Sequence, residues 1–148
     1  MKKVIIIACI ALCAAFLCGG REDKEAPEEL PVIIAEPVKV SYPWDGASKI
    51  ENCTVTYYCC EKREHICGTG DGYTATGTEV TPWQSCAVDP LLIPLGSRVW
   101  VDFGDGVMHE LFAEDVGGAV NGAHIDIAVE THQEALDCGI DYATVYWK

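Results

Sequence analysis

From residue 51 onward, the sequence is divided into short β-type segments separated by glycine, and this pattern constrains the fold more than any other feature. Residues 52–58 combine β-branched and aromatic side chains, as strands do. Residues 97–103 and 107–113 flank Gly-Asp-Gly, which is typical of a β-hairpin. Three further extended segments are predicted, at residues 72–78, 123–129 and 143–147. Short strands at this spacing favour a small closed barrel.

One short helix is predicted before the last strand. Thr131-His-Gln-Glu134 is a capping box, in which the Thr and Glu side chains bond free amides at the helix start. Ala135 and Leu136 supply an apolar face, and Gly139 is suited to the end of a helix. The pattern predicts an all-β barrel with one short helix.

Three aspartates, Asp89, Asp115 and Asp126, stand at apolar or glycine-rich junctions between these segments. An ionised carboxylate that is buried without a partner is costly, so such acids are usually paired, protonated or functional. Cationic partners are scarce, because Arg98 is the only Arg or Lys in residues 65–147. Three acids in one cleft would raise the pKa of at least one of them, and a carboxyl group that keeps its proton can act as a general acid.

The alternation in residues 124–129 indicates where Asp126 points. The odd positions are aliphatic and should enter the core, so His124 and Asp126 share the opposite face. An acid on that face lies at a groove or in solvent. The alternative interpretation is that Asp126 is only the polar side of a half-exposed strand.

The other acids also have structural interpretations. Asp115 precedes Val116-Gly117-Gly118, where the backbone can turn sharply and a ligand can approach, but an aspartate there can equally bond its own loop. Asp89 precedes a proline, and Asp-Pro often starts a turn. Asp102 and Asp105 belong to the hairpin and are predicted to be solvated.

The cysteines allow two interpretations. Six of them follow the first 20 residues: Cys53, Cys59, Cys60, Cys67, Cys86 and Cys138. An even number in an exported chain favours disulfides, whose pairing the sequence leaves open. The alternative is a metal site, because Cys59, Cys60, His65 and Cys67 are soft ligands, although adjacent cysteines are not the usual zinc spacing. His109 and His132 are interpreted as surface groups rather than ligands.

The N-terminal part of the chain predicts export. Residues 1–20 contain two lysines and then an apolar run that has the length of a signal-peptide core and is short for a membrane span. Cleavage, lipidation of a cysteine and an uncleaved anchor all remain open. Residues 21–50 are rich in charge and proline and predict an acidic linker, followed by one domain over residues 51–148. Contact with a membrane is expected only through the N-terminal segment.

The charge of the chain argues against one class of partner. It has 23 acidic and 10 basic residues, with a formal net charge of −13. Because phosphate binding needs a basic surface, nucleic acid is not expected as a partner. The acidity favours a neutral or cationic ligand, and the sequence does not indicate an oligomeric state.

A series of short motifs resembles the bacterial 3D domain, a family named for three aspartates. The motifs are residues 74–78 (TATGT), 87–90 (AVDP), 93–96 (IPLG), 113–122 (AEDVGGAVNG), 124–126 (HID) and 135–139 (ALDCG). Their order and spacing match from about Cys53 to the C-terminus, and residues 115–126 also resemble the membrane-bound lytic transglycosylase A family. Thr76 stands where family members commonly have Ser, and the cysteine-rich start and Cys138 depart from the family.

The resemblance implies a six-stranded double-psi β-barrel, a cell-wall location and cleavage of peptidoglycan glycan strands. A lytic transglycosylase cuts the bond between N-acetylmuramic acid and N-acetylglucosamine without water, because the muramic C6 hydroxyl attacks the anomeric carbon and leaves a 1,6-anhydro ring. One carboxyl group can serve as acid and then as base, whereas an ordinary glycosidase needs two. The resemblance implies neither a cofactor nor a catalytic metal.

By position in the motifs, the resemblance assigns roles to the three acids. Asp126 is the acid, Asp115 is the neighbour that raises its pKa or stabilises the transition state, and Asp89 orients them. The predicted substrate-binding residues are Thr76, Gly77, Thr78, Gly117, Gly118 and His124.

Two other functions remain open from the sequence. The first is a glycan-binding, wall-loosening module that does not cleave its ligand. In such a module Trp83, Trp100 and Trp147 are candidate sugar-stacking residues, although a lone Trp near a strand is more often core. The second is a site for a hard cation, held by the three aspartates and His124.

Overall fold

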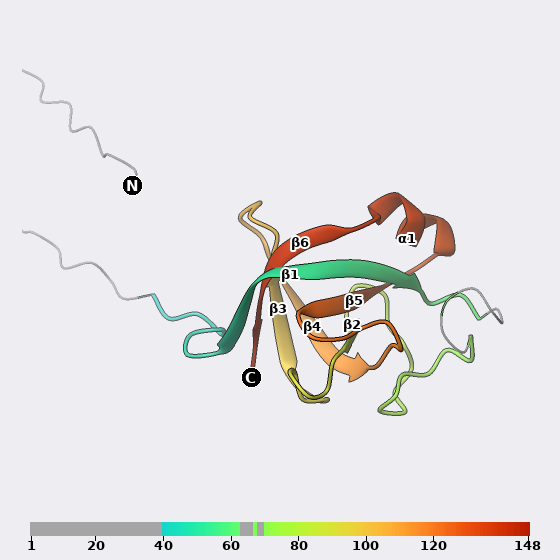
Figure 1. Cartoon of the computed structure of the whole chain (residues 1–148), viewed down its shortest axis with the longest axis horizontal. Coiled ribbons are helices and arrows are strands. Elements are labelled where there is room, and N and C mark those ends of the chain that lie inside the picture. Colours follow the sequence, from blue (N-terminus) through green and yellow to red (C-terminus); the bar gives the residue numbers. More distant parts are fainter. Residues whose placement is uncertain (1–39, 63–66, 68–69) are drawn as a thin grey trace, which may run out of the picture. The chain divides into compact units, whose positions relative to one another are not determined.

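Six strands form a closed barrel with one helix beside it in this computed structural model, which describes residues 40–62, 67 and 70–148 (Figure 1). The predicted export segment, most of the predicted linker and His65 lie outside the described residues. The elements are β1 (Ser48–Cys59), β2 (Ser85–Val88), β3 (Arg98–Asp102), β4 (Met108–Asp115), β5 (His124–Val129), α1 (His132–Cys138) and β6 (Asp141–Trp147).

The strands follow the order β1-β5-β2-β4-β3-β6 around the barrel, and β6 pairs with β1 to close it. The β1/β5 and β2/β4 pairs are parallel, and the other four pairs are antiparallel. β5 therefore lies between β1 and β2, and β2 lies between β5 and β4. The predicted all-β fold, a six-stranded double-psi barrel with one short helix, is confirmed.

All six strands contribute apolar side chains to one core inside the barrel. Ile125 and Ile127 of β5 are 0% and 1% exposed, as the predicted alternation requires. Closing the sheet leaves no free strand edge in the barrel, so backbone amides and carbonyls are paired around it. The polar residues of β5 are thereby directed away from a continuous core.

The sixth strand is not the one that the sequence predicted. Residues 72–78 form a tight turn with one isolated bridge, Tyr73 to Glu79, because Gly72 and Gly77 adopt φ values of +82° and +84°. β2 takes the sixth place instead. It has four residues, all buried, so it lacks the alternation that would have identified it.

The helix α1 is built as its capping box predicts. The hydroxyl of Thr131 accepts from the amide of Glu134 at 3.1 Å, and Gly139 ends the helix with a positive φ while its amide donates to the Ala135 carbonyl at 3.2 Å. The helix packs against β1 and β5 (Figure 1). Within the part of the chain that the structure describes, no helix has the length and apolar character needed to cross a bilayer.

Candidate functional site

Asp126 and His124 lie on one face of β5 and both contact the hydroxyl of Thr56 on β1. Thr56 pairs with Asp126 across the parallel β1/β5 ladder. Its hydroxyl donates to Asp126 Oδ1 at 2.7 Å and lies 2.9 Å from His124 Nε2, while His124 Nδ1 lies 3.2 Å from the Ala119 carbonyl oxygen. The predicted shared face is confirmed, and Thr56 joins the two side chains, a role that the sequence analysis did not identify.

The Thr56 hydroxyl has a single proton, which limits the states of these three groups. When it donates to an ionised Asp126 it has to accept from Nε2, and His124 then donates from both ring nitrogens as a cation. When Asp126 is protonated, it can donate to Thr56, and Thr56 can donate to the bare Nε2 of a neutral His124. A chain of hydrogen bonds thus links the carboxyl group to the imidazole through a hydroxyl.

Burial raises the pKa of the Asp126 carboxyl above its ordinary value of 3.8. The Thr56 hydrogen bond and the charge of His124 lower this pKa, and the charge of Asp115 raises it, but desolvation is the largest effect. Asp126 therefore has the property that a general acid needs, a protonated form that its surroundings favour.

Asp115, the last residue of β4, is fixed by three hydrogen bonds. Its Oδ1 accepts from the amides of Ala75 at 3.0 Å and Val116 at 2.9 Å, and its Oδ2 accepts from the Tyr58 hydroxyl at 3.2 Å. Burial, followed by the charge of Asp115, raises the pKa of Tyr58, so the phenol stays a neutral donor. Asp115 bonds its own loop and also faces Tyr58, a partner that no sequence signal indicated.

Ala87 of β2 lies between the two acids. It pairs with Asp126 on the β5 side and with Asp115 on the β4 side. Residues in register on neighbouring strands point to the same side of a sheet, and neighbouring strands lie about 4.8 Å apart, so the two acids flank one small side chain. The Cα atoms of Asp115 and Asp126 are therefore roughly 10 Å apart, and the methyl group of Ala87 leaves the space above it open.

A cavity of about 270 Å³ opens over this part of the barrel. Its wall comes from the end of β1, residues 70–73, Ala87 and the turn that follows β4. Four of the predicted site residues line it: Asp115, Gly117, Gly118 and Asp126. The cavity is large enough for a sugar unit, and four carboxyl-bearing residues line it: Glu61, Asp71, Asp115 and Asp126.

Gly117 is required by the turn that forms one side of the cavity. A Cβ at this position would stand 2.7 Å from Val120 Cγ2, closer than side chains normally approach. The amide of Val120 also donates to the Gly117 carbonyl at 3.0 Å, which closes the turn. The glycines of this turn were predicted to let a ligand approach, and at Gly117 the side chain that approaches is that of Val120.

Asp89 is not among the residues that line this cavity. Its Oδ1 accepts from the amide of Leu91 at 2.9 Å, and its Oδ2 accepts from the amide of Gly122 at 2.8 Å. These bonds, with that of Gly122 the stronger influence, lower the pKa of Asp89 below its ordinary value. The structure brings two of the three predicted acids together, and Asp89 instead ties the turn after β2 to the loop before β5.

Thr76, Gly77 and Thr78 are exposed and also lie outside the cavity lining. The hydroxyls of Thr74, Thr76 and Thr78 bond one another at 2.7 to 3.2 Å. Ala75 within this segment donates its amide to Asp115, so the threonine turn borders the site without entering it. His124 contacts Asp126 through Thr56 and is likewise not a lining residue.

The tryptophans are placed differently from one another. Trp100 is 2% exposed and belongs to the core, and Trp147 is half-buried against it. Trp83 is 41% exposed, its Nε1 donates to Glu134 Oε1 at 3.0 Å, and its ring lies 5.9 Å from that of Tyr57. Of the three candidates for stacking on a sugar, Trp83 alone presents an exposed ring.

Within the described residues no two cysteine sulfurs are joined, and the disulfides remain a prediction. Cys53 and Cys86 are buried among aliphatic side chains and act as small apolar residues in the core. The carboxyl groups of the three aspartates are also not close enough to one another to form a cation site. In residues 40–62, 67 and 70–148, the one group of three metal-binding side chains with neighbouring ligand atoms is Cys59, Cys67 and His132.

The chain is similar to a known protein family and to curated proteins of Bacillus subtilis. Residues 84–147 match the model of the 3D domain. Cell wall-binding protein YocH of Bacillus subtilis (strain 168) is 37% identical over 102 residues, which are 67% of this chain and 32% of that protein. The chain spans about a third of the length of the curated relatives it matches.

Two solved structures are similar over part of this chain. The crystal structure of MltA from E. coli has 27% identity and a TM-score of 0.44, covering 51% of this chain and 27% of that one. The Streptomyces papain inhibitor has 20% identity and a TM-score of 0.47, covering 68% of this chain and 94% of that one.

Proposed function

Because residues 84–147 of this chain are a 3D domain, we propose that the protein binds peptidoglycan glycan strands and cleaves them as a lytic transglycosylase. The observation that carries this proposal is Asp126, a half-buried carboxyl with a raised pKa at the wall of a cavity. Asp115, two strands away, faces the same cavity. A polar sugar chain is also a ligand that a strongly acidic protein can accept, since it does not need a basic surface.

In the proposed reaction, Asp126 acts first as acid and then as base. It donates its proton to the oxygen that links N-acetylmuramic acid to N-acetylglucosamine, and the bond from that oxygen to the muramic anomeric carbon breaks. The muramic C6 hydroxyl then bonds to the anomeric carbon, and its proton passes to the Asp126 carboxylate. The products are a free N-acetylglucosamine end and a 1,6-anhydro ring, and Asp126 regains its proton without water.

The neighbouring residues would stabilise two charges that form in this reaction, the positive charge of the transition state and the negative charge of the Asp126 carboxylate. The Asp115 carboxyl group lies across Ala87 from Asp126, and as a carboxylate it would stabilise a positively charged oxocarbenium-like transition state. The Thr56 hydroxyl and His124 would steady Asp126 in the interval in which it is a carboxylate, because both favour its ionised form. Tyr58 would hold Asp115 in place through its hydrogen bond.

The remaining predicted residues are proposed to act at the border of the site. Gly117 would shape the cavity wall by admitting Val120, and Gly118 would let a sugar approach the backbone of that wall. Thr76, Gly77 and Thr78 would bind hydroxyl groups of a strand that runs past the cavity. Asp89 would act as a positioning residue, because it fixes Gly122 in the loop that leads to His124.

A second function, glycan binding without cleavage, is favoured by a separate observation. A relative of this chain is named a cell wall-binding protein. In that case the cavity holds a glycan and Asp126 never transfers a proton. Both functions place the protein outside the cell, at the wall or the outer face of the membrane, as the sequence of residues 1–20 predicts. The two functions have the same ligand, a glycan strand, and differ in whether a cleaved product is released.

Digestion of purified sacculi distinguishes the two functions. The full chain is incubated with sacculi, and the soluble fraction is analysed by mass spectrometry, while the pellet is assayed for bound protein. Release of 1,6-anhydro muropeptides that stops in Asp126→Asn supports the lytic transglycosylase. Binding in the pellet without any release supports the wall-binding module, and failure of the protein to bind or release would contradict both.

A further inference from the structure

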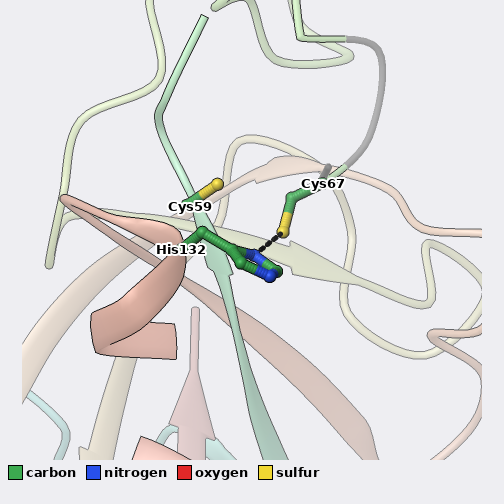
Figure 2. A group of neighbouring side chains, drawn as sticks. All are labelled: Cys59, Cys67 and His132. Atoms are coloured by element: carbon green, nitrogen blue, oxygen red, sulfur yellow. Dashed lines mark hydrogen bonds between the residues drawn. The ribbon is translucent and has the colours of Figure 1, made fainter. Parts of the chain in front are cut away.

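Cys59, Cys67 and His132 come together on the side of the barrel where β1 ends and α1 begins (Figure 2). Their ligand atoms all lie within 4.8 Å of one another. The Cys67 Sγ atom is 3.5 Å from His132 Nδ1, and Figure 2 shows the Cys67 sulfur and the imidazole directed toward each other. None of the three is used by the proposed cleavage reaction.

Independent parts of the fold fix two of these side chains. Cys59 is the last residue of β1 and is 4% exposed. His132 is the first residue of α1 and follows the N-cap residue Thr131, so the capping bond sets its position. Because β1 and α1 pack against each other, the thiol and the imidazole are held near one another before any ligand arrives.

The spacing of these atoms is compatible with a tetrahedral soft-metal site. With Zn–S bonds of about 2.3 Å and Zn–N bonds of about 2.0 Å, tetrahedral angles put two sulfurs about 3.8 Å apart and a sulfur and a nitrogen about 3.5 Å apart. The distance of 3.5 Å from Cys67 Sγ to His132 Nδ1 equals this separation, and the separations that involve Cys59 Sγ are at most 4.8 Å.

We propose that Cys59, Cys67 and His132 form a binding site for a soft divalent metal, with Zn²⁺ as the metal that this ligand set suits. Two thiolates and one imidazole satisfy the preference of zinc for sulfur and nitrogen ligands, and a water molecule would complete four-coordination. A disulfide between the two cysteines would use the sulfurs but would give the adjacent imidazole no role. The presence of His132 is therefore what distinguishes a metal site from a redox pair.

Binding requires a defined exchange of protons. Cysteine binds a metal ion as the thiolate. The metal displaces one proton from each thiol and two protons go to solvent. His132 binds through the lone pair of Nδ1 and keeps its hydrogen on Nε2. No electron is transferred, and the ion remains divalent.

The site would clamp one wall of the cavity. Cys59 and Cys67 both line the cavity that Asp115 and Asp126 face. A metal bound to these cysteines and to His132 would join the end of β1, the segment that contains Cys67 and the start of α1. The inference concerns the construction of this wall and holds whether the protein cleaves glycan or only binds it.

Titration of the full chain with Zn²⁺ by isothermal calorimetry, in a phosphine reductant, tests the site. One zinc ion should bind per chain, and Cys67→Ser and His132→Gln should each weaken binding by about 100-fold or more, since even the loss of an outer partner of a metal ligand costs 10- to 100-fold. Cys138→Ser and His109→Gln are the matched controls, each removing the same atom type outside the group, and should bind as the parent does.

Titration with Co²⁺ gives a spectroscopic readout of the ligands. The parent protein should show an intense thiolate-to-cobalt absorption band that is halved in Cys67→Ser and shifted in His132→Gln. The two variants alter half-exposed residues, so far-ultraviolet circular dichroism should confirm that they remain folded. Equal zinc affinity in all variants, or a Cys59–Cys67 disulfide in a peptide map of the non-reduced secreted protein, would overturn the proposal.

Discussion

Asp126 and Asp89 are the same kind of residue at two junctions of the barrel, and their surroundings act on them in opposite directions. Asp126 is half-buried on β5 at the cavity wall, and burial raises its pKa. Asp89 is in the turn after β2, and two backbone amides lower its pKa. The surroundings favour the protonated form of Asp126 and the ionised form of Asp89.

This difference is the physical basis for proposing Asp126, and not Asp89, as the acid. A carboxylate that accepts two amides satisfies backbone groups that would otherwise lack partners, and its role is to fix a turn. A carboxyl whose burial is only partly compensated by one hydroxyl and one imidazole retains the capacity to exchange a proton. The sequence motifs assign both aspartates to one site, whereas the structure has only Asp126 lining the cavity.

The largest expected effect is on catalysis. Asp126→Asn should lower the release of anhydro muropeptides from sacculi by about 100-fold or more, because general acid–base catalysis contributes 10²- to 10⁴-fold. Asp89→Asn should retain most of the activity per folded molecule, measured in the same assay after correction for the folded fraction. A larger loss in Asp89→Asn than in Asp126→Asn would reverse the comparison.

The next effect is on binding in the space between the acids. Ala87→Leu should place a larger side chain between Asp115 and Asp126 and reduce sedimentation with sacculi by about tenfold, while overpacking destabilises the fold by about 1–3 kcal/mol. Ala87→Ser adds one small atom and serves as the control. Unchanged binding by a folded Ala87→Leu protein would show that the ligand does not enter this cavity.

The sequence predicted the parts of this site that depend on local pattern. The alternation of β5 placed His124 and Asp126 on one face, and the capping box placed the start of α1. It did not predict β2, because the four buried residues of this strand show no alternation. It predicted a strand at residues 72–78, because a pattern of threonines does not reveal the positive φ values of Gly72 and Gly77.

Partners that are distant in the chain could not be predicted in the same way. Thr56 reaches Asp126 across 70 residues, and Cys67 reaches His132 across 65. Both contacts depend on β5 lying beside β1 and on α1 packing there, which are consequences of the crossover topology. The opposite environments of Asp89 and Asp126 depend on that topology as well. The amide of Gly122 that bonds Asp89 and the strands that bury Asp126 belong to other parts of the chain.

A smaller effect is expected on stability, with opposite signs for the two acids. A raised pKa means that the folded state binds the proton more tightly, so Asp126 lowers stability as pH rises above the ordinary value of 3.8. Asp89 contributes stability above that value and loses it as pH falls through its lowered folded pKa.

Thermal unfolding at several pH values tests these signs. At pH 7, Asp126→Asn should raise the Tm and Asp89→Asn should lower it by a few degrees. Both differences should shrink when the pH is lowered below 3.8. A Tm loss at pH 7 in both variants would mean that Asp126, like Asp89, is a structural anion.

The smallest expected effect is a shift of the pH profile. Thr56→Val removes a hydrogen bond that lowers the pKa of Asp126, so that pKa should rise further. Because the acid has to be protonated, activity falls as pH rises through this pKa, and the falling limb of the profile should move to higher pH. Thr54→Val on the same strand is the control. An identical shift in both variants would show that loss of the hydrogen bond is not the cause of the shift.

A carbon-13 NMR titration of the aspartate carboxyl groups tests most directly whether Asp126 is the acid that keeps its proton. The account predicts that the Asp126 resonance titrates with a pKa above 3.8 and that of Asp89 with a pKa below 3.8, each assigned by its Asn variant. A pKa for Asp126 at or below that of Asp89 would contradict it.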